Sequence, residues 1–362
     1  MNIEELFWLY LNNIPDLSAS VFAQLYYKYQ QRDAFLKALT EGEIKLDEIY
    51  KRELLCDEWL VRVNKTVKYM EKRNISVTFY HMRNYPYRLK TIDYAPPILY
   101  YIGDISITDM DSVAIVGSRV STSYGKKCAK TFGNELAEND ICIISGMADG
   151  IDSYAHWAAL EVGGKTIAVL GGGVDNIYPQ TNAELYYEIA KSGLLVSEYP
   201  LASKPQRNHF PERNRIITGL ADCLVVAEAG LPSGTMSTVD CALDQGKNVY
   251  AIPGSIHSAS SAGTNYLIKC GSLCAIDPSD VLVEFGFYQL DDEQGAIPDD
   301  ESFDDVDRNI LKLLTIEPLT AEELEEALNI DPFQLNTALS MLEISDYISK
   351  DDERRYTINK GR

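Results

Sequence analysis

The spacing of apolar residues changes along the chain and divides it into segments of different predicted structure. In residues 1–72 apolar side chains recur every three or four positions, which predicts helices, for example over 4–11, 19–29 and 32–40. From residue 113 onward, short β-branched runs alternate with helical stretches. Continuous apolar strands separated by helices are typical of a parallel sheet covered on both faces. We therefore predict a central doubly wound α/β domain.

This pattern gives a domain order. The segments are an all-α N-terminal domain over 1–72, a connector over 73–110, the α/β domain over 111–288, a linker over 289–304 and a small domain over 305–362. The strands of the α/β domain are predicted at 113–117, 141–145, 166–170, 194–197, 223–228 and 248–253, and its helices at 124–138, 153–161, 182–191, 213–219 and 236–245. A further strand is expected at 75–80. The last domain combines helices at 305–314, 320–328 and 332–344 with a short strand, which suits a winged helix-turn-helix unit.

The connector and the linker are predicted from their amino-acid composition. The stretch 84–104 is rich in proline and tyrosine, and Pro96 and Pro97 would break any helix there, so it is interpreted as a connector that packs onto the next domain. Residues 289–305 are acidic and poor in apolar groups, which favours a linker.

Charge and composition narrow the functional classes. The formal net charge is -21, but it divides into +1 for residues 1–100, -9 for 101–290 and -13 for 291–362. A local basic groove therefore remains compatible with the acidic total. The chain has no apolar stretch near the roughly 18 residues of a membrane span, and it starts with acids where a signal peptide has basic residues. These features predict a cytoplasmic protein. The seven cysteines and four histidines lack metal-ligand spacing and predict reduced thiols and no metal.

The first strand of the α/β domain ends in a candidate anion site. Gly117-Ser118-Arg119 follows the strand, and three hydroxyl residues at 121–123 precede the next helix. Parallel sheets bind ligands at the carboxyl ends of their strands, and a helix N-terminus beside an arginine attracts anions. The alternative is a capped turn with a solvated arginine.

Further strands end in small residues. Gly146 and Gly150 lie in the turn after the second strand, where a backbone phosphate nest is possible, and Asp152 is interpreted as the N-cap of the following helix. Three glycines at 171–173 follow the third strand, and Gly-Leu-Pro-Ser-Gly-Thr at 230–235 follows the fifth. Such turns at one sheet edge predict a surface that a ligand backbone can approach closely.

The densest basic cluster of the domain is Asn208-His-Phe-Pro-Glu-Arg-Asn-Arg215, with Lys204 and Arg207 just before it. Cations interleaved with an exposed ring suit single-stranded nucleic acid, because the cations hold phosphates and the ring stacks a base. Alternatively, Phe210 belongs to the core, and Arg213 or Arg215 pairs with a carboxylate. The residue pattern leaves both interpretations open.

Several enzyme classes are disfavoured by motif. The turn after the first strand does not match the GxGxxG of dinucleotide-binding sites, and Gly164-Lys165-Thr166 leads into a strand where a P-loop lysine opens a helix. The chain has no GxSxG sequence and no evident Cys/His pair for nucleophilic catalysis.

The ordered motifs VAIVGSR, SGMADGID, AVLGGGVDNIYP, SEYP, HFPERNRII, SGTMST and IPGS resemble the DprA (Smf) family of bacterial DNA-processing proteins over about 85–285. This resemblance implies a Rossmann-like core, a sterile-alpha-motif-like N-terminal domain and a variable winged-helix tail. It further implies a homodimer that binds and protects single-stranded DNA and loads RecA onto it during natural transformation. The family implies neither a cofactor nor a catalytic step.

The resemblance also assigns roles to individual residues. The DNA-binding residues that it implies are Ser118, Arg119, Gly146, Gly150, Lys204, Phe210, Arg213, Asn214 and Arg215. The two glycines would permit close backbone approach. Helix 332–344 contains no Lys or Arg, so we expect the tail to contact protein rather than read duplex DNA.

Two alternative functions remain within the same superfamily: a nucleotide-processing phosphoribohydrolase and a nucleotide sensor. The phosphoribohydrolase signature PGGxGTxxE would fall at Pro232-Ser233-Gly234-Thr235, and its catalytic glutamate would fall at Thr238. A hydroxyl cannot provide the general acid/base chemistry of a carboxylate. This position therefore disfavours the enzyme.

Overall fold

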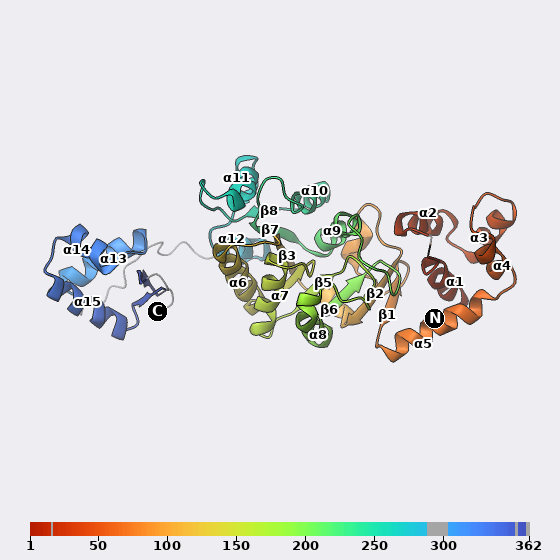
Figure 1. Cartoon of the computed structure of the whole chain (residues 1–362), viewed down its shortest axis with the longest axis horizontal. Helices are drawn as coiled ribbons and strands as arrows, with labels where there is room; N and C mark the ends of the chain where they lie inside the picture. Colours follow the sequence, from red (N-terminus) through yellow and green to blue (C-terminus); the bar gives the residue numbers. More distant parts are fainter. Residues whose placement is uncertain (16, 288–302, 352–353, 360–362) are drawn as a thin grey trace. The chain divides into compact units, whose positions relative to one another are not determined.

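The computed structural model describes residues 1–15, 17–287, 303–351 and 354–359 (Figure 1). Its contacts separate the chain into two compact units, Met1–Tyr288 and Gln289–Arg362. The first unit contains the helical N-terminus and the α/β core, and the second contains a small helical fold. None of the helices among the described residues combines the length and the apolar character that crossing a membrane needs.

Five helices form the N-terminal part of the first unit, and this part of the prediction is confirmed. They are α1 (Ile3–Asn12), α2 (Ala19–Tyr29), α3 (Arg32–Thr40), α4 (Glu48–Leu55) and α5 (Trp59–Lys72). The rings of Phe7, Trp8, Phe35 and Trp59 pack edge to face in their core, with Phe7 5.4–5.6 Å from each of the other three. Aromatic pairs at such distances add to the stabilisation from burial.

A nine-stranded sheet forms the α/β core, in the order β1-β2-β6-β5-β4-β3-β7-β8-β9. The strands are β1 (Ser76–Phe79), β2 (Ile98–Gly103), β3 (Ser112–Gly117), β4 (Cys142–Ser145), β5 (Thr166–Val169), β6 (Leu194–Ser197), β7 (Cys223–Glu228), β8 (Val249–Ala251) and β9 (Leu273–Cys274). Strands β3 to β9 are parallel to one another, and β1 and β2 add an antiparallel edge. The predicted doubly wound α/β core is thus confirmed.

Helices cover both faces of this sheet (Figure 1). They are α6 (Ser123–Glu138), α7 (Ile151–Glu161), α8 (Ala183–Ser192), α9 (His209–Leu220), α10 (Met236–Asp244), α11 (Ala262–Lys269) and α12 (Ser279–Leu282), with 3-10 helices at Tyr87–Thr91, Ile105–Asp109, Gln180–Asn182, Ala259–Ser261 and Val283–Phe285. Val113 and Ile115 pack with residues of α6, α7 and α12. Ala114 and Val116 pack with residues of α9, α10 and α11. Alternate residues of β3 thus point to opposite faces, which explains the continuous apolar runs of the strands.

The connector contributes more to the sheet than the sequence predicts. After Pro97 the run from Ile98 forms β2, which pairs with β6 and brings β1 into the same sheet. The buried hydroxyl of Tyr100 on β2 donates a hydrogen bond to Asn12 Oδ1 at 2.7 Å and accepts one from Asn13 Nδ2 at 2.8 Å. These bonds join α1 to the sheet edge.

The second unit consists of α13 (Asp305–Ile316), α14 (Ala321–Leu328), α15 (Pro332–Ile344) and the antiparallel pair β10 (Ile348–Lys350) and β11 (Tyr356–Ile358). Its core includes Leu311, Leu324 and Leu339. This is the element order predicted for the tail, with one further strand, and its assignment to the winged-helix class stays a prediction. Most of the predicted linker over 289–304 lies outside the described residues.

Candidate functional site

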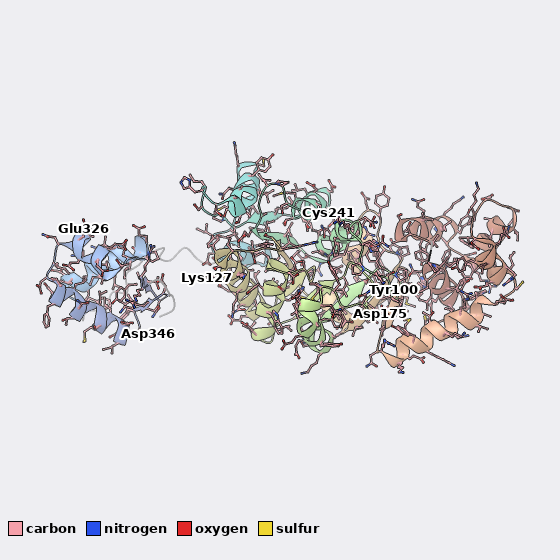
Figure 2. All side chains as sticks on the ribbon, viewed as in Figure 1. Tyr100, Lys127, Asp175, Cys241, Glu326 and Asp346 are labelled. Carbon is pink, nitrogen blue, oxygen red and sulfur yellow. The ribbon has the colours of Figure 1, made fainter. Side chains whose placement is uncertain are left out.

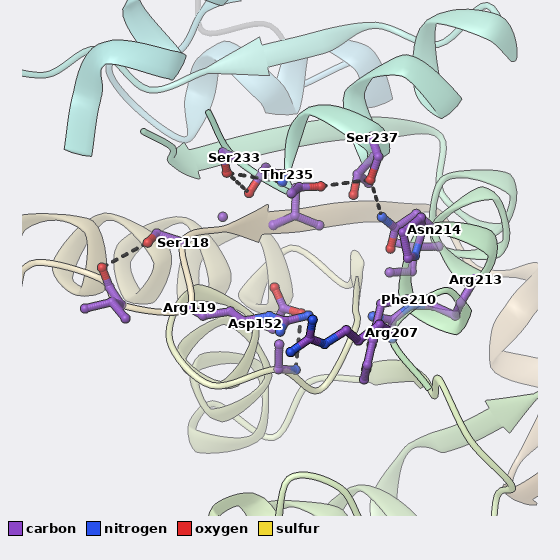
Figure 3. A pocket seen from close by; sticks show the side chains of 18 of the residues that line it. Ser118, Arg119, Asp152, Arg207, Phe210, Arg213, Asn214, Ser233, Thr235 and Ser237 are labelled. Carbon is purple, nitrogen blue, oxygen red and sulfur yellow. Dashed lines mark hydrogen bonds between the residues drawn. The ribbon is translucent and has the colours of Figure 1, made fainter. Parts of the chain in front are cut away.

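A cavity of about 650 Å³ lies at the carboxyl edge of the sheet, where the sequence predicted a ligand surface (Figure 3). It is bounded by the turn after β3, the first turn of α7, the N-terminal part of α9 and the loop before α10. A smaller cavity adjoins it and shares Arg119, Ala148, Tyr178 and Phe210 with it. Of the predicted residues, the large cavity brings together Ser118, Arg119, Phe210, Arg213 and Asn214.

Arg119 and Phe210 meet in the wall that the two cavities share. The guanidinium carbon of Arg119 lies 5.0 Å from the centre of the Phe210 ring, which is within cation–π range. The ring of Tyr178 lies 5.8 Å from the same ring. Arg119 is exposed and Phe210 is half-buried. Phe210 is therefore neither a pure core residue nor a free surface ring, and a cation lies beside it at the cavity.

Arg213 has a different environment from Arg119, because only 3% of it is exposed. Its guanidinium donates a 2.7 Å hydrogen bond to the carbonyl of Gly146 and another to that of Val169, and so holds the ends of β4 and β5. Desolvation lowers the pKa of Arg213 to about 10, while Asp152 raises it. Burial likewise raises the pKa of Asp152, against the effect of Arg213. The two buried charges thus stabilise each other beneath the cavity.

The two predicted glycines make room for protein atoms. A Cβ atom at Gly146 would lie 2.6 Å from a guanidinium nitrogen of Arg213. Gly150 has φ +81°, and a Cβ there would collide with the carbonyl oxygen of Ser118, which accepts a 3.1 Å hydrogen bond from Ile151 N–H. Both glycines therefore shape the site through its own residues, and close approach of a ligand backbone stays a prediction.

A carboxylate of the protein itself occupies the N-terminus of α6. Glu228, at the end of β7 and buried, accepts hydrogen bonds from the Thr122 hydroxyl at 2.6 Å and the Thr122 N–H at 3.1 Å. The Thr122 hydroxyl in turn caps α6 by accepting from Gly125 N–H at 3.1 Å. The predicted anion site therefore does not include the N-terminus of α6. The positive charge of that site comes from Arg119.

Lys204 and Arg215 lie outside both cavities. Lys204 is exposed in the segment before α9. Arg215 donates a 2.6 Å hydrogen bond to the buried carboxylate of Glu198. This pair matches the alternative interpretation of the sequence, in which Arg213 or Arg215 pairs with a carboxylate. Burial raises the pKa of Glu198, and Arg215 lowers it.

Residues outside the predicted set complete the cavity. Arg207 lines it, although the sequence placed it only at the margin of the basic cluster. Asp152 lines the cavity as well. Helix α7 begins at Ile151, and its N-cap residue is Gly150. The interpretation of Asp152 as the N-cap is therefore wrong. Its carboxylate instead accepts a 3.2 Å hydrogen bond from Ala148 N–H.

The far wall of the cavity is lined by hydroxyl and amide groups. Asn214 is buried and donates a 2.9 Å hydrogen bond to the hydroxyl of Ser237. Ser233, Thr235 and Thr238 line the cavity beside them. The turn at 230–235 gave the signal for this wall in the sequence. With three arginines, the two aromatic rings of Tyr178 and Phe210, and Asp152 as the one carboxylate among the described lining residues, the cavity suits an anionic ligand with flat groups.

Comparisons with known proteins identify the family of the chain. Residues 76–286 match the family model described as DNA recombination-mediator protein A. The chain is 44% identical over 203 residues to the DNA processing protein DprA of Streptococcus pneumoniae, covering 56% of this chain and 72% of that protein. It is 42% identical over 210 residues to Protein Smf of Escherichia coli, covering 57% of this chain and 56% of that protein.

Two solved structures share the fold. The X-ray structure of DprA from Streptococcus pneumoniae aligns with a TM-score of 0.63 at 33% identity, over 80% of this chain and all of that one. A structure of DNA processing protein A from Helicobacter pylori, which concerns the single-stranded DNA binding mode of that protein, aligns with a TM-score of 0.54 at 32% identity, over 58% of this chain and 95% of that one. On this evidence the chain belongs to the family of DNA recombination-mediator protein A, also named DprA or Smf.

Proposed function

We propose that this protein binds single-stranded DNA at the cavity on the carboxyl edge of its sheet. The observation that carries the proposal is the contact between Arg119 and Phe210, a cation and an aromatic ring that meet at the cavity. Arg119 and Arg207 would hold phosphates, and Phe210 would stack a base. Asn214 would donate a hydrogen bond through the amide N–H that does not bind Ser237. The Ser118 hydroxyl, which already donates to the Val120 carbonyl at 2.9 Å, would accept one. Arg213 would add positive potential from below. The relation to the Helicobacter pylori protein supports the choice of single strands.

The acidic total charge of the chain does not oppose this proposal. The excess of acids is concentrated in residues 291–362, which belong to the second unit. Steering of a polyanion depends on the local field, and the lining of the cavity carries three arginines against one carboxylate. We infer that Lys204, which is exposed in the segment before α9, extends the positive surface along which the DNA strand binds.

We further propose that the protein acts in the cytoplasm as a homodimer. In this role it would protect incoming single strands and load RecA recombinase onto them during natural transformation. The family relationship supports this role, and the site supports its first step, the capture of the strand.

The loading step is tested by following RecA filament formation on a labelled single strand. The wild-type protein should shorten the lag before filament growth, and Arg119→Ala should restore most of the lag. Lys269→Ala is the matched control, because Lys269 is an exposed cation at the end of α11, away from both cavities. Wild-type protein that binds the strand and leaves the lag unchanged would refute the loading role alone.

A further inference from the structure

A second large cavity lies elsewhere in the first unit, between α8 and the segment that joins α5 to β1. Its volume is about 600 Å³, and its lining includes Arg73, Asp175, Ile177, Tyr187 and Lys191. The cavity shares no residue with the site described above. None of the nine DNA-binding residues that the family resemblance implies lines it.

The loop after β5 forms a wall between this second cavity and the DNA site. Asn176 and Tyr178 line the small cavity beside Phe210, whereas Asp175 and Ile177 line the second cavity. Neighbouring residues of one loop thus face the two spaces in turn. A nucleic-acid strand that is bound beside Phe210 therefore needs to cross only this loop to enter the second cavity.

The second cavity has two cations that are available to a ligand. Arg73 and Lys191 are exposed, and neither takes part in an ion pair among the described residues. The carboxylate of Asp175 is already engaged, since it accepts from the Tyr69 hydroxyl at 2.7 Å and from the Ala202 N–H at 2.8 Å. The guanidinium of Arg73 lies 4.0 Å from the centre of the Tyr69 ring, which fixes it at the cavity rim.

An exposed aromatic ring accompanies these cations. Tyr187 on α8 is 61% exposed, and its ring lies 5.5 Å from that of Tyr186 at an angle of 89°. Tyr186 is itself held by a 2.6 Å hydrogen bond from its hydroxyl to the carbonyl of Val174. The outer ring is therefore supported from one side, and its exposed surface is available to stack a base.

Helix α5 continues the positive charge beyond the cavity. Lys65, Lys68 and Lys72 are exposed and follow one another at spacings of three and four residues, which places them on one face of the helix. The helix ends at Lys72, next to Arg73. A basic stripe therefore leads to the rim of the cavity.

We propose that the second cavity is a further subsite for single-stranded nucleic acid, in which Arg73 and Lys191 hold phosphates and Tyr187 stacks a base. This proposal rests on the proposed function, because it extends the same strand across the loop after β5. The combination of a supported ring with free cations favours a nucleic acid over an acidic peptide, which would need no stacking surface. The binding tract then runs from the sheet edge to α5.

The test compares oligo-dT strands of increasing length, from about four to about sixteen nucleotides, with the full-length protein. Strands too short to cross the loop should bind wild type and Arg73→Ala/Lys191→Ala equally. Longer strands should bind the double variant more weakly, with a log–log salt slope smaller by about 0.7 for each lost phosphate contact. Tyr187→Ala should lose roughly 5-fold to 150-fold in affinity for the long strands alone.

The matched control is Lys127→Ala/Lys269→Ala, which removes two exposed cations outside the three cavities. Figure 2 shows Lys127 at one end of the first unit, well apart from Asp175. The control should bind every strand as wild type does. Unchanged affinity of both test variants for long strands, or equal losses at all lengths, would overturn the second subsite.

Two other outcomes distinguish a failure of the second subsite from a failure of the proposed single-strand binding. Wild-type protein that binds no strand of any length would refute the proposed function itself. Wild-type protein that binds polyglutamate more tightly than the long strands, with the same dependence on Arg73 and Lys191, would replace the nucleic acid with an acidic partner. Thermal unfolding of each variant separates lost binding from lost structure, and photocrosslinking from a photoreactive residue at 187 reports contact directly.

Discussion

Two of the three arginines that line the cavity at the sheet edge, Arg119 and Arg213, should differ in what their removal does. Arg213 is 3% exposed and donates hydrogen bonds to the carbonyls of Gly146 and Val169, with Asp152 as its compensating charge. Arg119 is exposed and contacts the ring of Phe210. Arg213→Ala therefore leaves buried carbonyls and a buried carboxylate without their partner, whereas Arg119→Ala removes a cation from the surface.

The magnitudes follow from these contacts. Breaking a buried charge interaction by removing one partner costs about 3–5 kcal/mol, and hydrogen bonds to charged groups contribute about 1.5–3 kcal/mol each. Arg213→Ala should thus lower the free energy of unfolding by about 3–5 kcal/mol. An exposed cation–π contact contributes about 0.5–1 kcal/mol, so Arg119→Ala should change stability by no more than about 1 kcal/mol.

Urea unfolding of the full chain, followed by tryptophan fluorescence, measures the difference. All three tryptophans, Trp8, Trp59 and Trp157, lie in the first unit. The midpoint should fall strongly for Arg213→Ala and hardly at all for Arg119→Ala, whereas both variants should lose affinity for oligo-dT. An Arg213→Ala protein that is as stable as wild type and binds DNA more weakly than Arg119→Ala would refute the division of roles.

Three further predictions concern single positions. Phe210→Ala should weaken oligo-dT binding by about 1–3 kcal/mol if the ring stacks a base; a lower melting temperature with intact affinity would instead make the ring part of the core. Gly150→Ala should lower both stability, by about 1–3 kcal/mol, and DNA affinity, because a side chain at φ +81° is strained and displaces Ser118; wild-type values in both assays would contradict this. Burial lowers the pKa of His156 from 6.5 to about 3, and the positive charge of Arg213 acts in the same direction. The imidazole Nδ1 lies 2.6 Å from the Thr166 hydroxyl, and Nε2 has no hydrogen-bond partner among the described residues. The unfolded imidazole then binds a proton that the folded one does not, so the stability from His156 is present above pH 6.5 and is lost as the pH falls toward 3. The unfolding free energy of His156→Gln should lack this part of the pH dependence, and parallel profiles for the two proteins would refute it.

The sheet core was predictable from sequence because its strands are buried on both faces. Runs such as Val113–Val116 are apolar at every position, and helical spacing separates them. Strand β2 also begins with an apolar run, but this run follows a proline pair within a tyrosine-rich stretch, which favoured a connector, and its partner β6 lies far along the chain. Only the long-range pairing turns this segment into a strand.

The site was predictable where sheet topology alone brings residues together. The turn at Ser118–Arg119 and the start of α9 meet because both lie at the carboxyl edge of the sheet. The different roles of Arg213 and Arg215 could be assigned only once the bounds of α9 were known. The two arginines are two residues apart on this helix, so their side chains point roughly 200° apart, and only Arg213 faces the cavity. The occupation of the α6 N-terminus by Glu228 depends on a contact across 106 residues, which no local pattern encodes.

Titration of the protein into labelled oligo-dT and into the matching duplex, at several salt concentrations, tests the central claim most directly. We predict that the single strand binds more tightly than the duplex and weakens with salt by about 0.7 in log–log slope for each phosphate neutralised. Arg119→Ala should reduce that slope by about one phosphate contact. Absence of single-strand binding at low salt, or binding of the duplex with equal affinity, would contradict the account.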